Sequence, residues 1–371
     1  MAPLLACNLE SALGVDDDGS SDGPGTQTTM APPETESGPA TGDGTGSGES
    51  SADTSGDTEP LPPADCGGRQ LRVATFNVEG VGSAGTPSFE ALVDILVRID
   101  ADVVCMEEVH ETETANLFAM ANAAGYPQAI QANPPPAIGG ELTNACIARA
   151  GLSLVASYSA EDLSSDPTAN DVGRDILVTR LDLSEEGGPP CGLGLVSLHL
   201  KSGQELQDWF RRQVEAERVV QAVARYRADH PDDPMVILGD LNENIDDPAL
   251  GTMFDQVPVG LPDSYHVGSD IVFPLTYQPF TTFEGQGFTI TDATQEDSDR
   301  DETWADLVRL DYVMVSAAQG LDAEVYNACR DNGVDDGPAG GSVVKAGDPL
   351  ACELSELASD HFPVLVDLSL P

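Results

Sequence analysis

The sequence predicts an α/β domain of about 300 residues, built from two packed β-sheets with helices on the outside. From about residue 68, short apolar runs alternate with stretches of helical periodicity. Most of six short islands in this region begin as β-prone runs and end in Asn, Glu, His or Asp. The islands are TFNVEG (75–80), VVCMEEVH (103–110), VSLHLKSG (196–203), VILGDLNEN (236–244), RLDYVMVS (309–316) and SDHFPV (359–364). Strands ending in this way project polar side chains from their carboxyl ends into one shared site.

The first half of the domain can be assigned element by element. Residues 71–78 and 101–106 are predicted strands. Between them the apolar positions Phe89, Leu92, Ile95, Leu96 and Ile99 recur at helical spacing. Further strands are expected at 152–156, 176–181 and 193–199, the last two forming a hairpin around Gly187-Gly188-Pro189-Pro190.

The second half contains the longest predicted helix, 205–229, with Phe210, Val214, Val220 and Val223 available for its inner face. The run at 235–238 is continuously apolar and ends in Gly-Asp, which is typical of a strand covered on both faces. Strands at 308–316 and 363–368 complete the domain. The segments 127–145, 158–173, 255–305 and 329–352 are interpreted as insertions that carry specificity.

Two neighbouring carboxylates, Glu107 and Glu108, end an apolar run, where an acid needs a metal or a proton. Alternation along a strand puts them on opposite faces, so only one is expected at the site, and the register favours Glu108. Asn77 ends the preceding strand, and its amide oxygen suits a hard cation such as Mg²⁺. Taken alone, Asn77 could equally be a cap of the turn that follows the strand.

His361 is the best candidate for a general base, because an imidazole titrates near neutral pH and can take a proton from water. Asp240 and Asn242 lie two residues apart and share one face of a strand end. A lone histidine is usually structural, but the chain has only five, and His199 also stands in an island.

Together the islands resemble the endonuclease/exonuclease/phosphatase superfamily, which has a deoxyribonuclease-I-like fold. The resemblance spans residues 71–368, and its most specific elements are GDLN (239–242) and SDH (359–361). It implies a four-layer sandwich of two β-sheets flanked by helices. It also implies an enzyme that cleaves phosphoester bonds with a divalent metal, Mg²⁺ or Mn²⁺, with Ca²⁺ also possible.

The resemblance implies a role for each polar position. Asp311 would fix the tautomer of the base His361, Asp240 would orient the nucleophile, and Asn242 would bind the phosphoryl oxygens. The metal ligands would be Glu108 and Asn77, assisted by Glu79 and Asp360. His199 and Arg174 would contact the phosphate, although Arg174 could also form a surface ion pair. Some relatives support the equivalent histidine with a Glu, which the segment CIARAGLSLVAS (146–157) lacks, so phosphate binding is favoured for His199 over full general-acid catalysis.

The chain is strongly acidic, with 64 acidic and 16 basic residues and a net charge of −48. Residues 1–65 contain 13 of the acids and no Lys or Arg, so 51 acids remain for residues 66–371. Such a surface repels nucleic acid and anionic membranes at long range and is typical of a salty or extracellular setting. There are only two lysines, Lys201 and Lys345.

The N-terminal 65 residues are rich in Gly, Ser, Thr, Pro and acids, and are interpreted as a disordered tether. Leu4-Leu5-Ala6-Cys7 resembles a bacterial lipobox, which implies a lipid anchor at Cys7 and an extracellular or cell-surface location. The apolar stretch is too short for a signal peptide, so either the true start lies upstream or the match is a coincidence.

Cysteine usage gives a second indication of the compartment. Cys105 lies in an apolar strand and is expected to be a buried free thiol. Five cysteines then remain besides Cys7, an odd number, and Cys329 with Cys352 is the expected disulfide because the two bracket a Gly- and Asp-rich excursion. The alternative is a set of reduced cysteines in a cytosolic protein.

The leading hypothesis is a secreted or surface-tethered, monomeric phosphoesterase that acts on a phosphodiester, with nucleic acid as the first candidate substrate. The HLKSG segment and the helix bearing Arg211, Arg212 and Arg218 resemble bacterial extracellular nucleases. No basic stripe of the kind that nucleic-acid binders carry is visible, so phospholipid and small phosphoesters remain alternatives. Other classes are a non-catalytic relative or a cation-binding surface protein, the latter supported only by the acidic run at 292–306, interpreted as a solvated loop.

Overall fold

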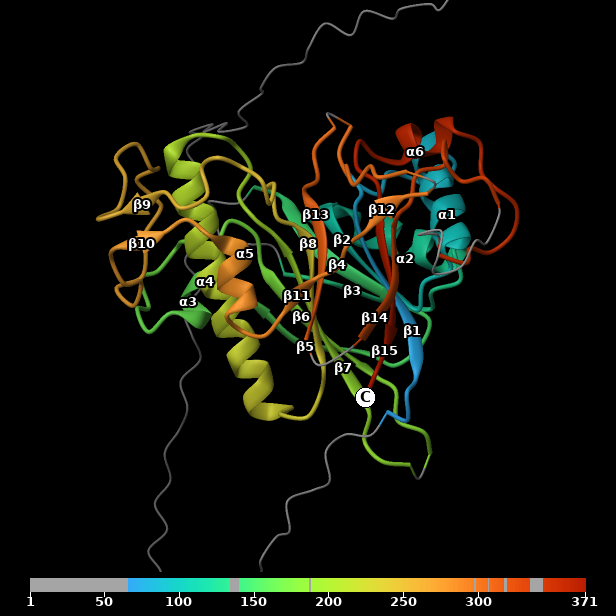
Figure 1. The fold of residues 1–371 in the computed structure, drawn as a ribbon, viewed down its shortest axis with the longest axis horizontal. Coiled ribbons are helices and arrows are strands. Elements are labelled where there is room, and N and C mark those ends of the chain that lie inside the picture. The colour runs from blue at the N-terminus through green and yellow to red at the C-terminus, as the bar shows by residue number, and fades with distance from the viewer. Residues whose placement is uncertain are drawn as a thin grey trace, which may run out of the picture. The chain divides into compact units, whose positions relative to one another are not determined.

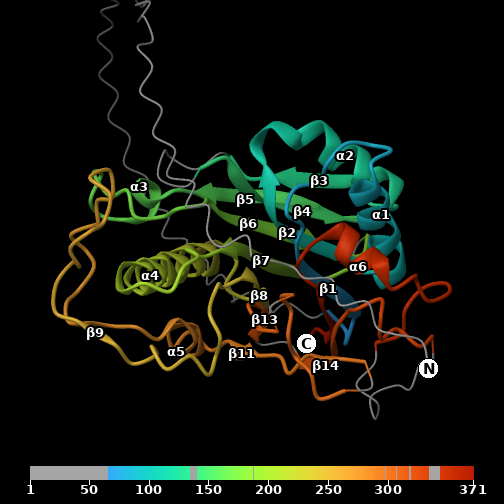
Figure 2. The ribbon, with the colours of Figure 1, turned by 90° about the horizontal axis from the view of Figure 1, so that it is seen from above.

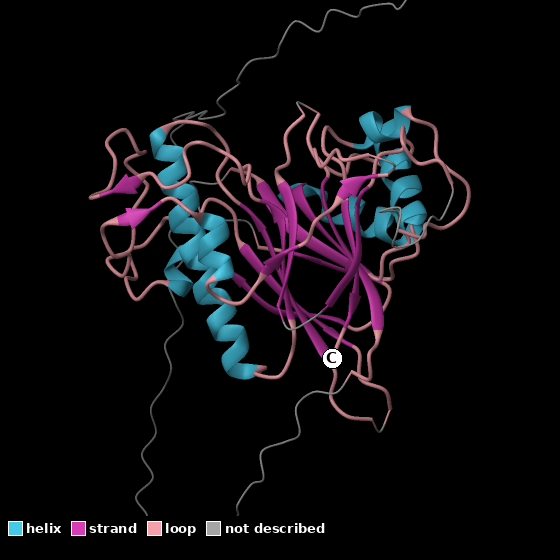
Figure 3. Ribbon diagram, in the orientation of Figure 1, coloured by secondary structure: helices cyan, strands magenta, loops and turns pink. Residues whose placement is uncertain are grey.

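The computed structural model describes residues 66–371 except 134–139, 187, 297, 306, 317–318 and 334–342. The predicted tether and the lipobox-like Cys7 lie outside these residues, so both stay predictions. Strands form the middle of the described domain and helices lie on both sides of them (Figures 1 and 3). None of the described helices combines the length and the apolar character that crossing a membrane requires.

The larger sheet has seven strands in the order β12-β14-β15-β1-β2-β4-β3. β1 pairs parallel with β2 on one side and antiparallel with β15 on the other. Its strands are β1 (Gln70–Asn77), β2 (Val103–His110), β3 (Gln128–Gln131), β4 (Leu142–Ala148), β12 (Thr294–Gln295), β14 (Gln319–Val325) and β15 (Val364–Ser369).

The smaller sheet has six strands in the order β11-β13-β8-β7-β6-β5. β7 runs parallel to β8, and β13 runs antiparallel to β8. Its strands are β5 (Leu152–Tyr158), β6 (Ile176–Asp182), β7 (Gly192–His199), β8 (Met235–Asp240), β11 (Thr289–Ile290) and β13 (Asp311–Ser316). A separate two-stranded ribbon pairs β9 (Met253–Phe254) with β10 (Leu275–Thr276).

Helices cover the outer faces of both sheets. They are α1 (Pro87–Ile99), α2 (Thr114–Ala123), α3 (Ala160–Leu163), α4 (Leu206–Asp229), α5 (Pro279–Glu284), α6 (Glu353–Ala358) and the single 3₁₀ turn η1 (Glu111–Glu113). The start of α1 illustrates the local chemistry: Thr86 caps it by accepting a hydrogen bond from the Phe89 amide, and Pro87 occupies the first turn, where its missing N–H costs nothing. Helices α1, α2 and α6 lie on one side of the strands and α4 and α5 on the other (Figures 1 and 2).

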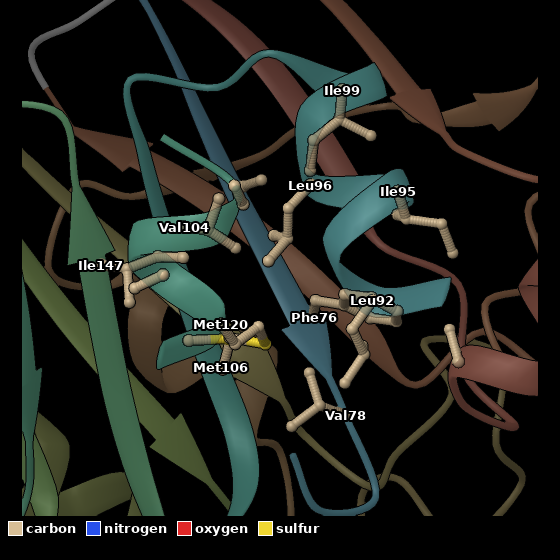
Figure 4. Close-up of a cluster of buried hydrophobic side chains, with 14 of the residues drawn as sticks. Phe76, Val78, Leu92, Ile95, Leu96, Ile99, Val104, Met106, Met120 and Ile147 are labelled. Atoms are coloured by element: carbon tan, nitrogen blue, oxygen red, sulfur yellow. The ribbon is translucent and has the colours of Figure 1, made fainter. Parts of the chain in front are cut away.

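Three apolar clusters separate the four layers. The first joins α1 and α2 to the larger sheet, and Figure 4 shows Leu92 and Leu96 of α1 packed against Phe76 and Val104. The second lies between the two sheets, and the third joins α4 and α5 to the smaller sheet. This arrangement confirms the predicted fold of two sheets flanked by helices.

The topology brings the polar ends of six strands to one edge of the sandwich, opposite the edge at which Figure 1 marks the carboxyl terminus. The parallel pairs β1–β2 and β7–β8 contribute their carboxyl ends, as the sequence predicts. β13 and β15 contribute from their amino ends, because both run antiparallel to their neighbours. The strand-end pattern, expected for most of the islands, therefore does not describe Asp311 and His361.

The cysteine assignments are partly wrong. Cys105 is not a free thiol: it forms a disulfide with Cys146, the residue directly opposite it on the antiparallel neighbour β4. Cys66 pairs with Cys191, and the predicted Cys329–Cys352 disulfide is confirmed. Once Cys105 has a partner, the six cysteines of the described residues pair completely. Three disulfides are typical of an oxidising, extracellular environment.

Other differences arise where tertiary packing overrides local pattern. The supposed insertion 127–145 contains β3 and the start of β4, and the strand predicted at 308–316 begins at Asp311. On α4, Val219 is fully buried and Val220 only partly so. The run at 292–306 is not a solvated loop, because it contributes β12 and buries Gln295, Glu296 and Thr303.

Candidate active site

Four strands place Asn77, Glu108, His199 and Asp240 in mutual contact. The Asn77 amide Nδ2 donates to Glu108 Oε1 at 3.1 Å and to Asp240 Oδ2 at 3.1 Å. His199 Nε2 lies 3.7 Å from Glu108 Oε1 and 3.5 Å from Asp240 Oδ2. Residues more than a hundred positions apart therefore form one polar cluster at the edge of the sandwich.

Glu108 reaches this cluster because the backbone of β2 is irregular there. The pairing of β2 with β4 shifts register between Met106 and Val109, and Glu108 has a φ of 59°, in the left-handed region. A bulge of this kind redirects a side chain that simple alternation would send to the other face. The structure therefore places Glu108 in the cluster, as predicted, but a bulge and not regular strand alternation directs its side chain there.

The cluster suits a divalent cation. Glu108, His199 and Asp240 each offer a ligand atom within 4.8 Å of one another. Burial, followed by the nearby Asp311 carboxylate, raises the pKa of Asp240 to about 7. In the described part of the chain, neither Glu108 nor Asp240 has an Arg or Lys at ion-pair distance. Adjacent carboxylates without an Arg or Lys partner supply the oxygen ligands that Mg²⁺, Mn²⁺ and Ca²⁺ prefer. The Asn77 side chain lies beside them, with Nδ2 toward both carboxylates and Oδ1 accepting from the Glu79 amide at 3.2 Å.

Glu107 lies beneath this cluster in a different environment. It is fully buried and accepts hydrogen bonds from the Thr75 hydroxyl at 3.0 and 3.1 Å. Burial and the Asp311 charge raise the pKa of Glu107 well above its usual value, which favours the uncharged acid. Glu107 is therefore suited to packing under the site rather than to binding a cation.

His361 and Asp311 form a second unit beside Asp240. His361 Nδ1 lies 2.8 Å from Asp311 Oδ2, and both residues are buried. Burial lowers the pKa of His361, but the carboxylates of Asp311, Asp240 and Asp360 outweigh it and raise the pKa to about 10. The Asp311 contact fixes Nδ1 as the protonated nitrogen, so that Nε2 is the atom left to exchange a proton.

Asn242 and Arg174 converge on a single acceptor beside the cluster. The backbone amide of Asn242, which has a φ of 52°, donates to Asp240 Oδ1 at 2.7 Å. The Asn242 amide group and Arg174 Nη1 both donate to the carbonyl of Leu200, at 3.1 and 3.4 Å. Among the described residues Arg174 forms no ion pair, so its interpretation as a surface ion pair is not what the structure shows.

His199 is buried in surroundings that favour its uncharged form. Burial, followed by the Arg174 charge, lowers its pKa well below the usual value. Its Nδ1 is also buried and has no hydrogen-bond partner within the described ranges, so no Glu there orients the ring through Nδ1. A neutral imidazole can donate a hydrogen bond to a phosphoryl oxygen but is a poor general acid.

Glu79 and Asp360 form the acidic rim. Glu79 is exposed, and its pKa is raised by partial burial and by the charges of Asp360 and Glu108. Asp360 accepts a hydrogen bond from the Trp304 indole at 3.0 Å. Beside them an open groove of ≈ 520 Å³ is lined by Glu79, Gly80, Glu108, His110, Thr112, Glu113 and Leu142. All ten residues singled out in the sequence therefore lie in or around one site.

The sequence did not reveal several residues that hold these groups in place. The Ser359 hydroxyl donates to the Asn77 carbonyl at 2.7 Å and accepts from the His361 amide at 3.0 Å. The Thr303 hydroxyl accepts from the Asp311 amide at 3.0 Å. Ser359 stands in the SDH motif and could have been found there, whereas Thr303 sits in the acidic run and gave no local signal.

Comparison with known proteins identifies the family. Residues 74–361 match the model of the Endonuclease/Exonuclease/phosphatase family. No curated protein showed a significant match. Among solved structures, an endonuclease/exonuclease/phosphatase from Beutenbergia cavernae is 19% identical, with 81% of this chain and 72% of that chain covered and a TM-score of 0.46.

Two further solved structures are similar. One is an endonuclease/exonuclease/phosphatase from Bacteroides vulgatus (16% identity, 82% of this chain and 100% of that chain, TM-score 0.48). The other is the human Nocturnin catalytic domain with bound sulfate (14% identity, 81% and 95%, TM-score 0.48). The family match covers most of the chain and includes all ten residues of the site, and the chain therefore belongs to the endonuclease/exonuclease/phosphatase family.

Proposed function

We propose that the protein is a divalent-metal-dependent phosphoesterase that hydrolyses phosphodiester bonds with a water molecule activated by His361. The observation that carries this proposal is the buried His361–Asp311 pair, 2.8 Å apart, beside the Glu108 and Asp240 carboxylates, which have no Arg or Lys at ion-pair distance in the described chain. A base and a cation site at one edge are the two parts that metal-assisted hydrolysis needs.

Glu108 and Asn77 would hold the cation, with Asp240 beside them and Glu79 and Asp360 adding negative charge at the rim. When bound, a divalent cation stabilises the negative charge that develops on the phosphoryl oxygens and offsets the carboxylates that raise the pKa of His361. Mg²⁺ or Mn²⁺ suits this oxygen-rich set, and Ca²⁺ is a further candidate.

His361 would take the proton of the attacking water on Nε2, because Asp311 holds the proton on Nδ1. Asp240 would orient the water, since its two oxygens are fixed by the Asn242 and Asn77 amides. Asn242, Arg174 and the neutral His199 would donate hydrogen bonds to the phosphoryl oxygens, where they stabilise the charge of the transition state.

Nucleic acid is the first candidate substrate, and a phospholipid or small phosphoester is the second. The cations Arg174 and Lys201, next to the cluster, favour a polyanion, whereas the net acidity of the chain disfavours one.

The three disulfides support a secreted enzyme, with surface tethering if Cys7 is lipidated, and we propose that the enzyme acts as a monomer.

The test compares the protein with His361→Ala on bis-p-nitrophenyl phosphate, plasmid DNA, RNA and sphingomyelin, with and without Mg²⁺ or Mn²⁺. His266→Ala is the matched control, because His266 is exposed and lies outside the site. We expect metal-dependent turnover that falls by roughly 10²–10⁴-fold in His361→Ala and is unchanged in the control. No turnover of any substrate by folded, metal-supplied protein would instead favour a non-catalytic, binding role.

A further inference from the structure

Positive charge gathers on one side of the proposed active site, although the chain as a whole carries −48. Arg174, Lys201 and Arg211 are close enough that the charges of Arg211 and Arg174 both lower the pKa of Lys201. Lys201 is one of only two lysines, and the other, Lys345, is buried against Glu324 at 2.9 Å. Lys201 is partly open to solvent, with a side-chain exposure of 29%.

The arginines of α4 divide into two kinds. Arg212 and Arg218 are fully buried and ion-paired, the first to Glu243 and the second to Asp171 and Asp270. They are structural and cannot form a basic surface. Arg211 differs, because its Nε is buried without a hydrogen-bond partner in the described structure and its guanidinium lies 5.3 Å from the Tyr265 ring centre.

The guanidinium of Arg211 lies beside the backbone segment that carries Arg174. A Cβ at Gly173 would lie 3.7 Å from Arg211 Nη2, so this guanidinium abuts the residue before Arg174. Arg174 in turn shares the Leu200 carbonyl with Asn242, and Lys201 follows Leu200 directly. Lys201 and Arg211 therefore continue outward from Arg174, which is proposed to bind the scissile phosphate.

In the described structure, none of these three cations donates a side-chain hydrogen bond to a carboxylate. Glu215 is the buried acid among them, but its oxygens accept from the backbone amides of Gly173 at 3.0 Å and Lys201 at 2.6 Å. Asp208 lies 3.9 Å from the Lys201 ammonium at the rim. The Nε of Arg174 is also buried and has no hydrogen-bond partner among the described residues. Buried guanidinium donors without acceptors are costly, and an oxyanion would satisfy them.

We propose that Lys201 and Arg211, with Arg174 between them and the reaction centre, form a second anion subsite that binds a phosphate of the substrate other than the one cleaved. This inference rests on the proposed phosphodiesterase function and narrows its substrate class. The preferred substrate is a phosphodiester that carries a further phosphate, either the next phosphate of a nucleic-acid strand or a terminal phosphate on a small molecule.

The test uses two chromogenic phosphodiesters that differ in one group. Thymidine 5′-p-nitrophenyl phosphate carries only the scissile phosphate, and its 3′-phosphorylated form carries a second one. We expect the wild-type protein to prefer the 3′-phosphorylated form through a lower KM. In Lys201→Gln and in Arg211→Gln, the ratio of kcat/KM for the two substrates should fall roughly tenfold, the effect of one lost charge-assisted hydrogen bond.

Arg69→Gln is the matched control, because Arg69 is exposed and precedes the end of β1 opposite to Asn77; its ratio should equal that of the wild type. Lys201→Gln keeps the test valid if Arg211→Gln fails to fold, since Lys201 is partly exposed. Hydrolysis of both substrates with the same ratio in wild type and Lys201→Gln would overturn the subsite alone. Hydrolysis of neither would overturn the proposed function itself.

A third substrate, in which the 3′-phosphate is esterified with a second thymidine, distinguishes the two sources of the phosphate. If the preference persists with this diester, the subsite accepts the neighbouring phosphate of a strand. If the preference is confined to the terminal monoester, the subsite serves a small phosphorylated molecule. Both results support the subsite, because the ratio depends on Lys201 in each.

Discussion

At the scale of the residue, one backbone angle determines which of two adjacent glutamates, Glu107 or Glu108, faces the site. Glu108 turns toward His199 and Asp240 because its φ is 59°, whereas Glu107 stays buried against Thr75. The environment of each then sets its chemistry. Burial favours the uncharged form of Glu107, while Glu108 lies at the open edge, beside a groove where a cation can enter.

Glu107→Gln and Glu108→Gln should therefore differ in their effect on metal-dependent hydrolysis. Glutamine resembles a protonated glutamic acid, so Glu107→Gln should retain metal-dependent hydrolysis within a few fold. Glu108→Gln removes a proposed ligand charge and should weaken metal affinity by roughly 10–100-fold, measured as the Mg²⁺ concentration for half-maximal turnover. The opposite pattern would assign the metal to Glu107.

The same substitution at Glu107 should change the pH dependence of stability. The folded-state pKa of Glu107 is raised above the unfolded value, so the folded protein binds the extra proton and loses stability as pH rises above the unfolded pKa. Glu107→Gln removes this loss. Urea unfolding at pH 5 and pH 8 should show the variant gaining stability relative to wild type at the higher pH, and equal differences at both would argue against a raised pKa.

At the scale of the element, α4 ties together the two loops that carry site residues. Arg212 Nη1 donates to the carbonyls of Lys201 and Gly203 at 2.9 and 2.7 Å, and Nε donates to the Tyr277 hydroxyl at 2.7 Å. Its Nη2 lies 3.2 Å from Glu243, which directly follows Asn242. One buried guanidinium thus positions the loop after β7 against the loop after β8.

Arg212→Met should cost about 3–5 kcal/mol in the free energy of unfolding, because it leaves Glu243 buried without a partner. Burial already raises the pKa of Glu243 to about 7 against the attraction of Arg212. Without Arg212 that pKa rises further, and since an acid with a raised folded-state pKa destabilises the fold as pH increases, the loss should be larger at pH 8 than at pH 5. Urea unfolding of Arg212→Met at both pH values measures it.

The double variant Arg212→Met with Glu243→Gln should recover part of the lost stability, because it removes the stranded carboxylate. Arg225→Met is the control, since Arg225 is an exposed arginine of the same helix. Equal losses in Arg212→Met and in the double variant would mean that lost packing and backbone contacts, rather than the buried charge, cause the effect.

Sequence patterns predicted the elements that have a local signal. They missed features that depend on contacts between residues distant in the chain. Strand β8 and helix α4 carry clear periodicity, and the six islands contain nine of the ten site residues, all except Arg174. The Cys105–Cys146 disulfide depends on the β2–β4 register, which no local pattern specifies. Thr303 and Arg211 act through residues distant in sequence, so their roles became visible only when the chain was folded.

At the scale of the whole molecule, the distribution of charge sets the conditions under which a polyanion can approach. The chain carries 64 acids against 16 bases, yet the proposed phosphate-binding side of the site is locally basic. Long-range repulsion and short-range attraction therefore oppose each other. Repulsion acts over the Debye length, about 30 Å at 0.01 M salt and about 10 Å at 0.1 M, whereas contacts inside the site are screened much less.

If nucleic acid is the substrate, added salt should accelerate its cleavage over the low range. Raising NaCl from about 10 to 150 mM reduces the range of the repulsion between the acidic protein surface and DNA, and it weakens the contacts inside the site much less. The kcat/KM for duplex DNA should therefore rise several-fold at constant free Mg²⁺. A nuclease with a basic binding surface shows the opposite dependence, because salt competes with its phosphate contacts. Bis-p-nitrophenyl phosphate, with a single negative charge, should change much less. A fall in kcat/KM for DNA over this range would mean that the Arg174, Lys201 and Arg211 cluster, rather than the net charge, governs the encounter.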